Sequence, residues 1–156
     1  MSQVELSTEP FGVRRQAASA LALELQPRCV YAYVSGFPAL RHKTSAVLAK
    51  GGTHPLMLHY DEAVREAQTY HGHKHFPGDY MLGGLAWSII RADIGRAVEL
   101  GKPVVVDVEF SDSMEMQKFT ESCFMRGAVA VTALCHTTEY EETWEEDGFT
   151  GVIWLV

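Results

Sequence analysis

Hydrophobic residues alternate with other residues in several short segments of the chain. In Pro103–Phe110, the residues Val104, Val106, Val108 and Phe110 fall on one side of an extended backbone, and this pattern predicts a strand. Four further segments are predicted to be strands, and Cys29–Phe37 among them is rich in β-branched and aromatic residues. These predicted strands are Cys29–Phe37, Pro55–His59, Ala128–Cys135 and Phe149–Val156.

A second spacing, with apolar residues three or four positions apart, predicts helices between the strands. Near the N-terminus, a stripe of alanine and leucine predicts a helix over about residues 9–26, which Pro27 ends. The last predicted helix begins at Ser111 or Ser113, because either hydroxyl can cap a first turn. The helices expected after the first are Ala39–Lys50, Glu62–Tyr70, Met81–Leu100 and Ser111–Met125.

Helices and strands follow one another without strict alternation, and the glycine motif GxGxxG of dinucleotide-binding sheets is absent from the sequence. Both observations favour an α+β domain over a doubly wound sheet. We therefore expect a small mixed sheet with flanking helices. At 156 residues the chain has the usual length of a single domain, here residues 1–156 with a core from residue 29 onward.

The composition is that of an ordinary globular protein, with 47% hydrophobic and 21% charged residues. A net charge of −7 argues against nucleic-acid binding, since that function uses a basic surface. The sequence lacks an apolar run of about 18 residues, the length needed to span a membrane. Its start also lacks the charged and then apolar pattern of a signal peptide, so a cytoplasmic protein without membrane association is expected.

Cysteine and histidine residues do not form a recognisable metal or catalytic motif. The three cysteines are odd in number and include no CxxC pair, which favours reduced, buried thiols. His71, His73 and His75 alternate within a loop rich in glycine and proline, where solvated histidines are the simplest interpretation. No metal ion is predicted.

The most distinctive segment is the acidic stretch 139-EYEETWEED-147, which joins the two apolar strands near the C-terminus. Carboxylates on a loop between two buried strands form either a solvated turn or the rim of an active site. The choice between these two interpretations decides whether the chain carries an enzymatic site.

The order of the predicted elements resembles that of the ADP-ribosyltransferase fold. A strand ends in YVSGFP, a helix runs into a glycine pair through LRHKTSAVLAKGG, and MLHYDEAVREAQTY precedes a long helix and the strand PVVVDVEF. The closing segment, residues 125–156, is similar to the C-terminal end of phage-encoded anti-CRISPR ADP-ribosyltransferases. The resemblance implies an NAD-dependent transferase that modifies a host or partner protein, in a phage counter-defence role.

The resemblance also implies roles for individual residues. Glu145 matches the catalytic acid that precedes the terminal strand, while Glu139 and Glu141 form a rival pair. Cleavage of NAD passes through a cation-like ribose, and a carboxylate can offset its positive charge. Ser35 stands where the family usually has histidine or arginine, which is a departure from the motif. The residues implied to line the NAD site are Ser35, Gly36, His54, Tyr60 and Tyr70.

Two other functions remain open from the sequence. An acidic inhibitor or immunity-type module, without enzymatic activity, would use the acidic stretch to dock on a basic protein partner, and the departure at Ser35 favours it. A phage enzyme that cleaves S-adenosylmethionine is the other alternative. The strand Tyr31–Phe37 is similar to the first strand of such enzymes, whereas Gly78-Asp79-Tyr80 matches only half of their glycine-tyrosine-glycine-glutamate core.

Overall fold

The computed structural model describes residues 5–8, 14–18, 25–33, 55–70, 79–107, 110, 112–135 and 146–155. Within these ranges, no helix is long and apolar enough to cross a membrane. The strands are β1 (Glu5–Thr8), β2 (Arg14–Ala18), β3 (Cys29–Tyr33), β4 (Leu56–His59), β5 (Val104–Asp107), β6 (Ala130–Cys135) and β7 (Gly151–Leu155). The helices are α2 (Tyr60–Tyr70), α3 (Asp79–Glu99) and α4 (Ser113–Met125).

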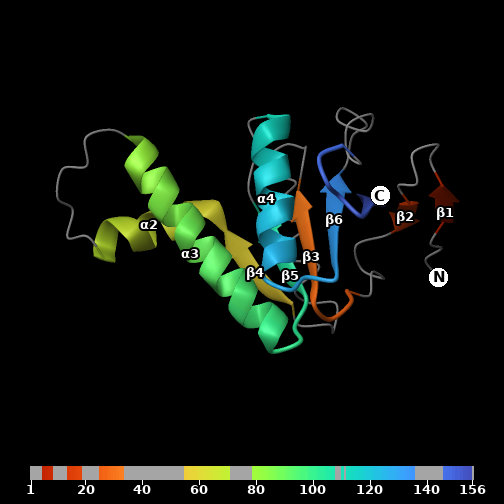
Figure 1. Cartoon of the computed structure of the whole chain (residues 1–156), viewed down its shortest axis with the longest axis horizontal. Coiled ribbons are helices and arrows are strands. Elements are labelled where there is room, and N and C mark those ends of the chain that lie inside the picture. The colour runs from red at the N-terminus through yellow and green to blue at the C-terminus, as the bar shows by residue number, and fades with distance from the viewer. Residues whose placement is uncertain are drawn as a thin grey trace.

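The described strands join one sheet in the order β1-β2-β7-β6-β3-β5-β4 (Figure 1). Neighbours from β2 to β4 in this order are parallel, whereas β1 is antiparallel to β2. Helices α2 and α3 connect β4 to β5, and α4 connects β5 to β6. The expected combination of helices with a mixed sheet is confirmed. The parallel crossovers, however, are those of an α/β domain rather than of the α+β class that the sequence favoured.

The central strands β3 and β5 are buried on both faces. Val104, Val105 and Val106 are fully buried, and Asp107, which follows them, is also buried. The valines belong alternately to two clusters of buried residues, which lie on opposite faces of the sheet. Successive residues of β5 therefore face opposite sides of the sheet, and both sides are buried. A continuous apolar run is the pattern expected of a strand in a parallel sheet.

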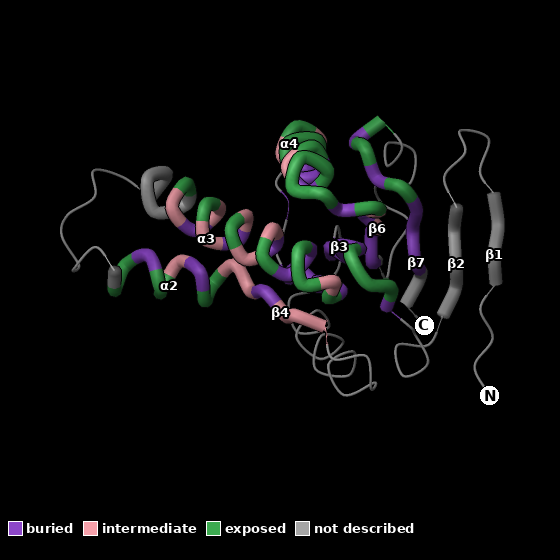
Figure 2. Tube along the Cα trace, turned by 60° about the horizontal axis from the view of Figure 1, so that its bottom comes forward, coloured by how far each residue is buried: buried purple, intermediate pink, exposed green. Residues whose placement is uncertain are grey.

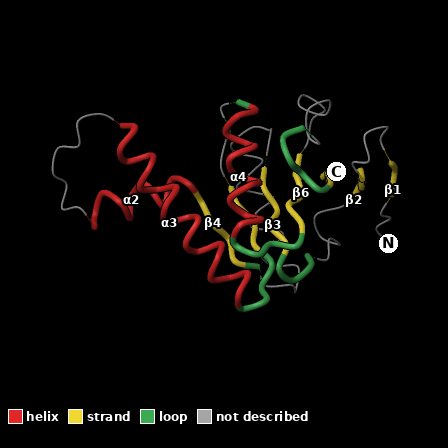
Figure 3. The backbone as a smooth tube through the Cα atoms, in the orientation of Figure 1, coloured by secondary structure: helices red, strands yellow, loops and turns green. Residues whose placement is uncertain are grey.

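Helices α3 and α4 lie on one face of the sheet, and α2 packs on α3 (Figure 1, Figure 2 and Figure 3). Their inward side chains, among them Ile90, Ile94, Met116 and Phe119, form the larger buried cluster together with valines and alanines of the strands. Full burial of each such side chain stabilises the folded state by about 1.5–3 kcal/mol. This packing fixes the two helices against the strands whose ends carry the candidate site.

The N-terminal segment differs from its prediction. Residues Arg14–Ala18 form β2, which pairs with β1 and β7, so the helix predicted over residues 9–26 is wrong for this part. Without β2, strand β7 would present an unpaired edge, and the pairing satisfies its backbone groups. The helical spacing of alanine and leucine cannot reveal this long-range contact. The helix expected at Ala39–Lys50 lies outside the described residues.

Strands β4, β6 and β7 and helices α2 and α3 confirm their predictions within a few residues. Strand β1 was not predicted. Helix α4 also forms, but its cap is Asp112 rather than Ser111 or Ser113. The backbone N–H of Glu115 donates to Asp112 Oδ1 at 2.8 Å. A carboxylate at this position also interacts favourably with the positive end of the helix dipole.

Candidate functional site

The strongest candidate site lies at the carboxyl edge of the sheet. Because β4, β5, β3 and β6 are parallel, their last residues His59, Asp107, Tyr33 and Cys135 all lie at this edge. The chain leaving β3 leads to β4 on one side, whereas the chain leaving β6 leads to β7 on the other. Ligands of open parallel sheets bind outside the carboxyl ends of the strands at such a switch point. In this sheet, the switch point lies between β3 and β6.

Asp107 and His59 form a polar pair at this edge. They are register partners on β5 and β4, and His59 Nδ1 lies 3.0 Å from Asp107 Oδ2. The Asp107 side chain is 1% exposed and that of His59 is 21% exposed. An ionised carboxylate can only accept, so Nδ1 carries the proton of this hydrogen bond. A buried carboxylate needs such a partner, and β5 fixes this one at the end of a run of buried valines.

An aromatic cluster extends from this pair toward the helices. Tyr60 follows His59 in the chain and packs against Trp87, with ring centroids 5.7 Å apart. Trp87 in turn contacts Phe110 and Phe119, with centroid distances of 6.2 and 6.0 Å. Burial raises the pKa of the Tyr60 phenol, and neighbouring carboxylates raise it further. The phenol therefore keeps its proton at neutral pH and can donate a hydrogen bond.

Most of the site residues implied by the resemblance lie outside the described residues. Tyr60 and Tyr70 are within them, as the first and last residues of α2, about 15 Å apart along the helix axis. The other implied site residues all lie outside the described ranges, and they are Glu139, Glu141, Glu145, Ser35, Gly36 and His54.

The strands that precede two of the predicted segments are neighbours in the sheet. Tyr33 and Leu134 are register partners on β3 and β6. The chain continues from β3 into the segment with Ser35 and Gly36, and from β6 into the acidic stretch. Both segments therefore leave the sheet from neighbouring strands at the switch point.

No protein-family model, curated protein or solved structure matches this chain. The chemistry of the carboxyl edge is therefore inferred from its own residues.

Sequence reasoning missed Asp107. The available signal was the run Val104–Val106 followed by an aspartate, which predicts a carboxylate at the carboxyl end of a buried strand.

A second sequence signal for a ligand site follows β3, where Gly36 precedes Lys43-Thr44. Phosphate-binding loops of the form GxxxxGK[ST] also connect a strand to a helix. In this chain Gly36 and the lysine are one position further apart than in that motif, and His42 replaces the second glycine.

The cysteines that the structure describes are buried thiols. Cys29 and Cys123 are both free and buried, which confirms the prediction of burial for these two. Burial raises the pKa of Cys29, and it raises that of Cys123 to about 12 although Arg126 opposes the change. The side chain of Cys135 lies outside the described residues.

Cys123 is expected to resist thiol reagents in the folded protein. With a pKa of about 12, roughly one thiol in ten thousand is a thiolate at pH 8, and the thiolate is the reactive form. Treatment with a thiol-specific disulfide reagent at pH 8, followed by mass spectrometry, should leave Cys123 unmodified until guanidinium unfolds the chain. Native labelling of Cys123 at the rate of a free cysteine would contradict its burial.

Proposed function

We propose that this protein is a nucleotide-dependent phosphotransferase that binds a nucleoside triphosphate with Mg²⁺ at the carboxyl edge of its sheet. The observation that carries the proposal is the buried carboxylate of Asp107 at the end of β5, directly beside β3 and its switch point. In nucleotide hydrolases and kinases, an aspartate in such a place holds the metal ion that accompanies the phosphates.

The residues at this edge fit a magnesium ion that arrives with its nucleotide. Such an ion keeps several waters and phosphate oxygens and needs only one or two protein carboxylates. Asp107 offers one, and the 3.0 Å hydrogen bond from His59 orients it. In the part of the chain that the structure describes, no three acidic, histidine or cysteine side chains gather as a resident metal centre would require. An ion bound mainly through the nucleotide is consistent with this donor set.

The sequence after β3 supports the same proposal. Gly36 lies three positions after the strand end at Tyr33, and Lys43 and Thr44 lie seven and eight positions after Gly36. In a phosphate-binding loop, glycine lets the backbone approach the phosphates, lysine neutralises them and the hydroxyl binds the metal ion. We assign these three roles to Gly36, Lys43 and Thr44. Phosphoryl transfer depends on positioning and charge stabilisation more than on covalent chemistry, and these residue types supply both.

A second candidate is the NAD-dependent ADP-ribosyltransferase implied by the resemblance. It is favoured by the register of Tyr33 with Leu134, because the Ser35-Gly36 segment and the acidic stretch leave the sheet from neighbouring strands. In this candidate NAD occupies the switch point, and Glu145 stabilises the cation-like ribose while ADP-ribose passes to a partner protein.

A thermal-shift panel distinguishes the candidates. The protein is melted with ATP and Mg²⁺, with ATP and EDTA, with NAD, and with S-adenosylmethionine. A ligand at 100 times its Kd stabilises the folded state by about 2.7 kcal/mol, which raises Tm by about 5–10 °C in a chain of this length. We expect this rise with ATP and Mg²⁺, and a smaller rise once EDTA removes the metal.

Each other outcome replaces the proposal with a named alternative. A rise with NAD alone supports the ADP-ribosyltransferase, and a rise with S-adenosylmethionine alone supports an enzyme that cleaves it. No rise with any of them contradicts a nucleotide site and favours a binding module that docks through its acidic stretch. Incubation with radiolabelled ATP or NAD and a host lysate then identifies the group that is transferred.

A further inference from the structure

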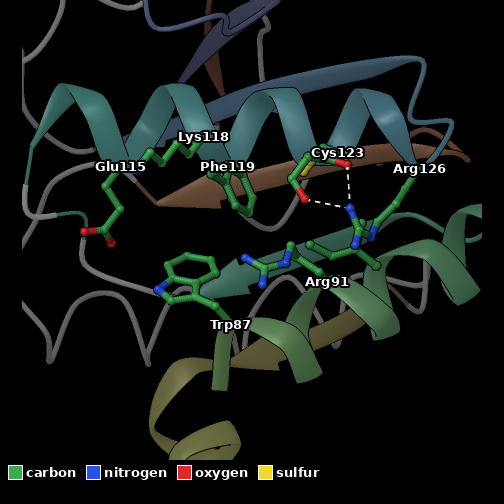
Figure 4. Close-up of a pocket in the computed structure, with 9 residues that line it drawn as sticks. Trp87, Arg91, Glu115, Lys118, Phe119, Cys123 and Arg126 are labelled. Atoms are coloured by element: carbon green, nitrogen blue, oxygen red, sulfur yellow. Dashed lines mark hydrogen bonds between the residues drawn. The ribbon is translucent and has the colours of Figure 1, made fainter. Parts of the chain in front are cut away.

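A pocket of about 130 Å³ lies between α3 and α4, on the helix-covered side of the sheet (Figure 4). Its lining residues come from these two helices and from the residue that follows α4, and none of them lies at a strand end. They are Trp87, Arg91, Ile94, Glu115, Lys118, Phe119, Ser122, Cys123 and Arg126. Trp87 and Phe119 also belong to the aromatic cluster that extends from the His59–Asp107 pair. We refer to the pocket as the α3–α4 pocket.

The floor of the α3–α4 pocket is apolar. Ile94, Phe119 and Cys123 are buried, and Trp87 lies against Phe119 with ring centroids 6.0 Å apart. Phe110 stacks on the same indole, with an angle of 29° between the ring planes. A surface of aromatic and aliphatic groups favours the apolar part of a ligand.

The rim of the α3–α4 pocket carries three cations and one carboxylate, namely Arg91, Lys118, Arg126 and Glu115. This is a local excess of positive charge in a chain whose net charge is −7. The ion pairs among the described residues do not include any of the three cations. Figure 4 shows Glu115 at one end, beside Trp87, and Arg126 at the other. Cations over an apolar floor attract an anion, because low-dielectric walls strengthen their field.

Contacts with the helices hold the two arginines in place. Arg126 Nη1 donates to Ser122 Oγ at 2.8 Å, and the aliphatic stem of Arg126 lies against Gly95, where a Cβ would meet Arg126 Cδ at 3.5 Å. Arg91 Nη2 donates to Ser88 Oγ at 3.3 Å. Each guanidinium has five N–H donors, so both keep donors for an anion. Side chains positioned in advance lose less entropy when a ligand binds.

We infer that the α3–α4 pocket binds a small organic acid. Its carboxylate or phosphate lies between Arg91 and Arg126, and an apolar body of one ring or a short alkyl chain covers Trp87 and Phe119. The pocket volume limits the size of the ligand. A cavity of about 150 Å³ holds benzene, whereas sites for drug-sized ligands occupy roughly 300–1,000 Å³. A nucleotide is too large for the pocket, so this is a second site and does not depend on the proposed function.

Benzoate and phenyl phosphate, with benzamide and benzyl alcohol as neutral counterparts, test the inference. In ¹H–¹⁵N spectra, the indole N–H of Trp87, assigned through Trp87→Phe, should shift saturably with the two acids. Neutral counterparts should bind at least about tenfold more weakly, because charge-assisted hydrogen bonds are lost. Arg91→Gln should weaken benzoate binding by a similar factor. Arg65→Gln, the matched change at an exposed position of α2, should leave it unchanged.

A blocking variant adds a test that does not depend on removing a charge. Ser122→Leu, at a half-buried position of the pocket wall, should abolish benzoate binding while the chain still melts cooperatively. The inference is overturned if benzamide binds as tightly as benzoate, if neither acid moves the Trp87 signal, or if ATP displaces benzoate. Asp107→Asn should not affect benzoate binding, so failure of this site is distinguishable from failure of the nucleotide site.

Discussion

Asp107→Asn is expected to lower nucleotide-dependent phosphoryl transfer at least about 100-fold, the loss typical of removing one group that stabilises transition-state charge. The substitution preserves the size of the side chain, and the amide oxygen can still accept from His59 Nδ1. It removes the negative charge that would hold the metal ion of the nucleotide. Steady-state turnover of ATP over a range of Mg²⁺ concentrations measures the effect, and high Mg²⁺ should restore part of the rate.

Asp93→Asn is the matched control for this substitution. Asp93 lies half-buried on α3 and forms a long ion pair with the exposed Arg96 at 3.8 Å. Such pairs contribute little to stability, so turnover and Tm should both stay close to those of the unchanged protein. If Asp107→Asn turned over ATP within a few-fold of the control and with the same Mg²⁺ dependence, the carboxyl edge would not be the nucleotide site. The Tm of both variants is measured in parallel, so that unfolding is not mistaken for lost chemistry.

Elements with a long and consistent apolar pattern were predictable from the sequence. Helix α3 and strand β6 coincide closely with the expected segments Met81–Leu100 and Ala128–Cys135. Their apolar residues Ile90, Ile94 and Val131 are buried. The spacing of apolar residues determines which side of a helix or strand can be buried, and this information is contained in a short stretch of sequence.

The order of the strands could not be predicted in the same way. Alternation indicates that β3, β5 and β6 are strands, but it does not indicate that β3 lies between the other two. For the same reason Arg14–Ala18, with two alanines that favour a helix, form a strand because β7 offers an edge to pair with. Tertiary pairing outweighs local helix propensity here, since each propensity difference is below about 1 kcal/mol.

The candidate site also depends on strand pairing, which explains why the sequence alone indicated other residues. Asp107 and His59 are 48 residues apart in the chain and meet because β4 and β5 are parallel neighbours. The sequence instead drew attention to Glu139, Glu141 and Glu145, where carboxylates are numerous. One carboxylate at the end of a buried strand is inconspicuous in composition. It becomes a candidate once the sheet is known to be parallel, because strand ends of such sheets face the ligand.

Gly148→Ala is expected to destabilise the fold by at least about 3 kcal/mol, a large part of the roughly 5–15 kcal/mol that stabilises a typical domain. Gly148 has a φ of +92°, where a side chain adds about 1–3 kcal/mol of backbone strain. Its Cβ would also overlap Thr120 Oγ1 and lie 3.2 Å from Thr120 Cβ. Thr120 cannot easily move, because its buried hydroxyl donates to the backbone oxygen of Asp147 at 2.7 Å.

Urea denaturation followed by circular dichroism measures this loss, and Gly84→Ala is the matched control. Gly84 is exposed on α3, and a Cβ there meets nothing within 4 Å, so alanine should stabilise the helix by up to about 1 kcal/mol. In a Thr120→Ala background, Gly148→Ala should cost less, because the overlap with the hydroxyl is removed while the backbone strain remains. Equal costs in the two backgrounds would assign the whole effect to the backbone. A cost below about 1 kcal/mol would contradict the close packing of this turn against α4.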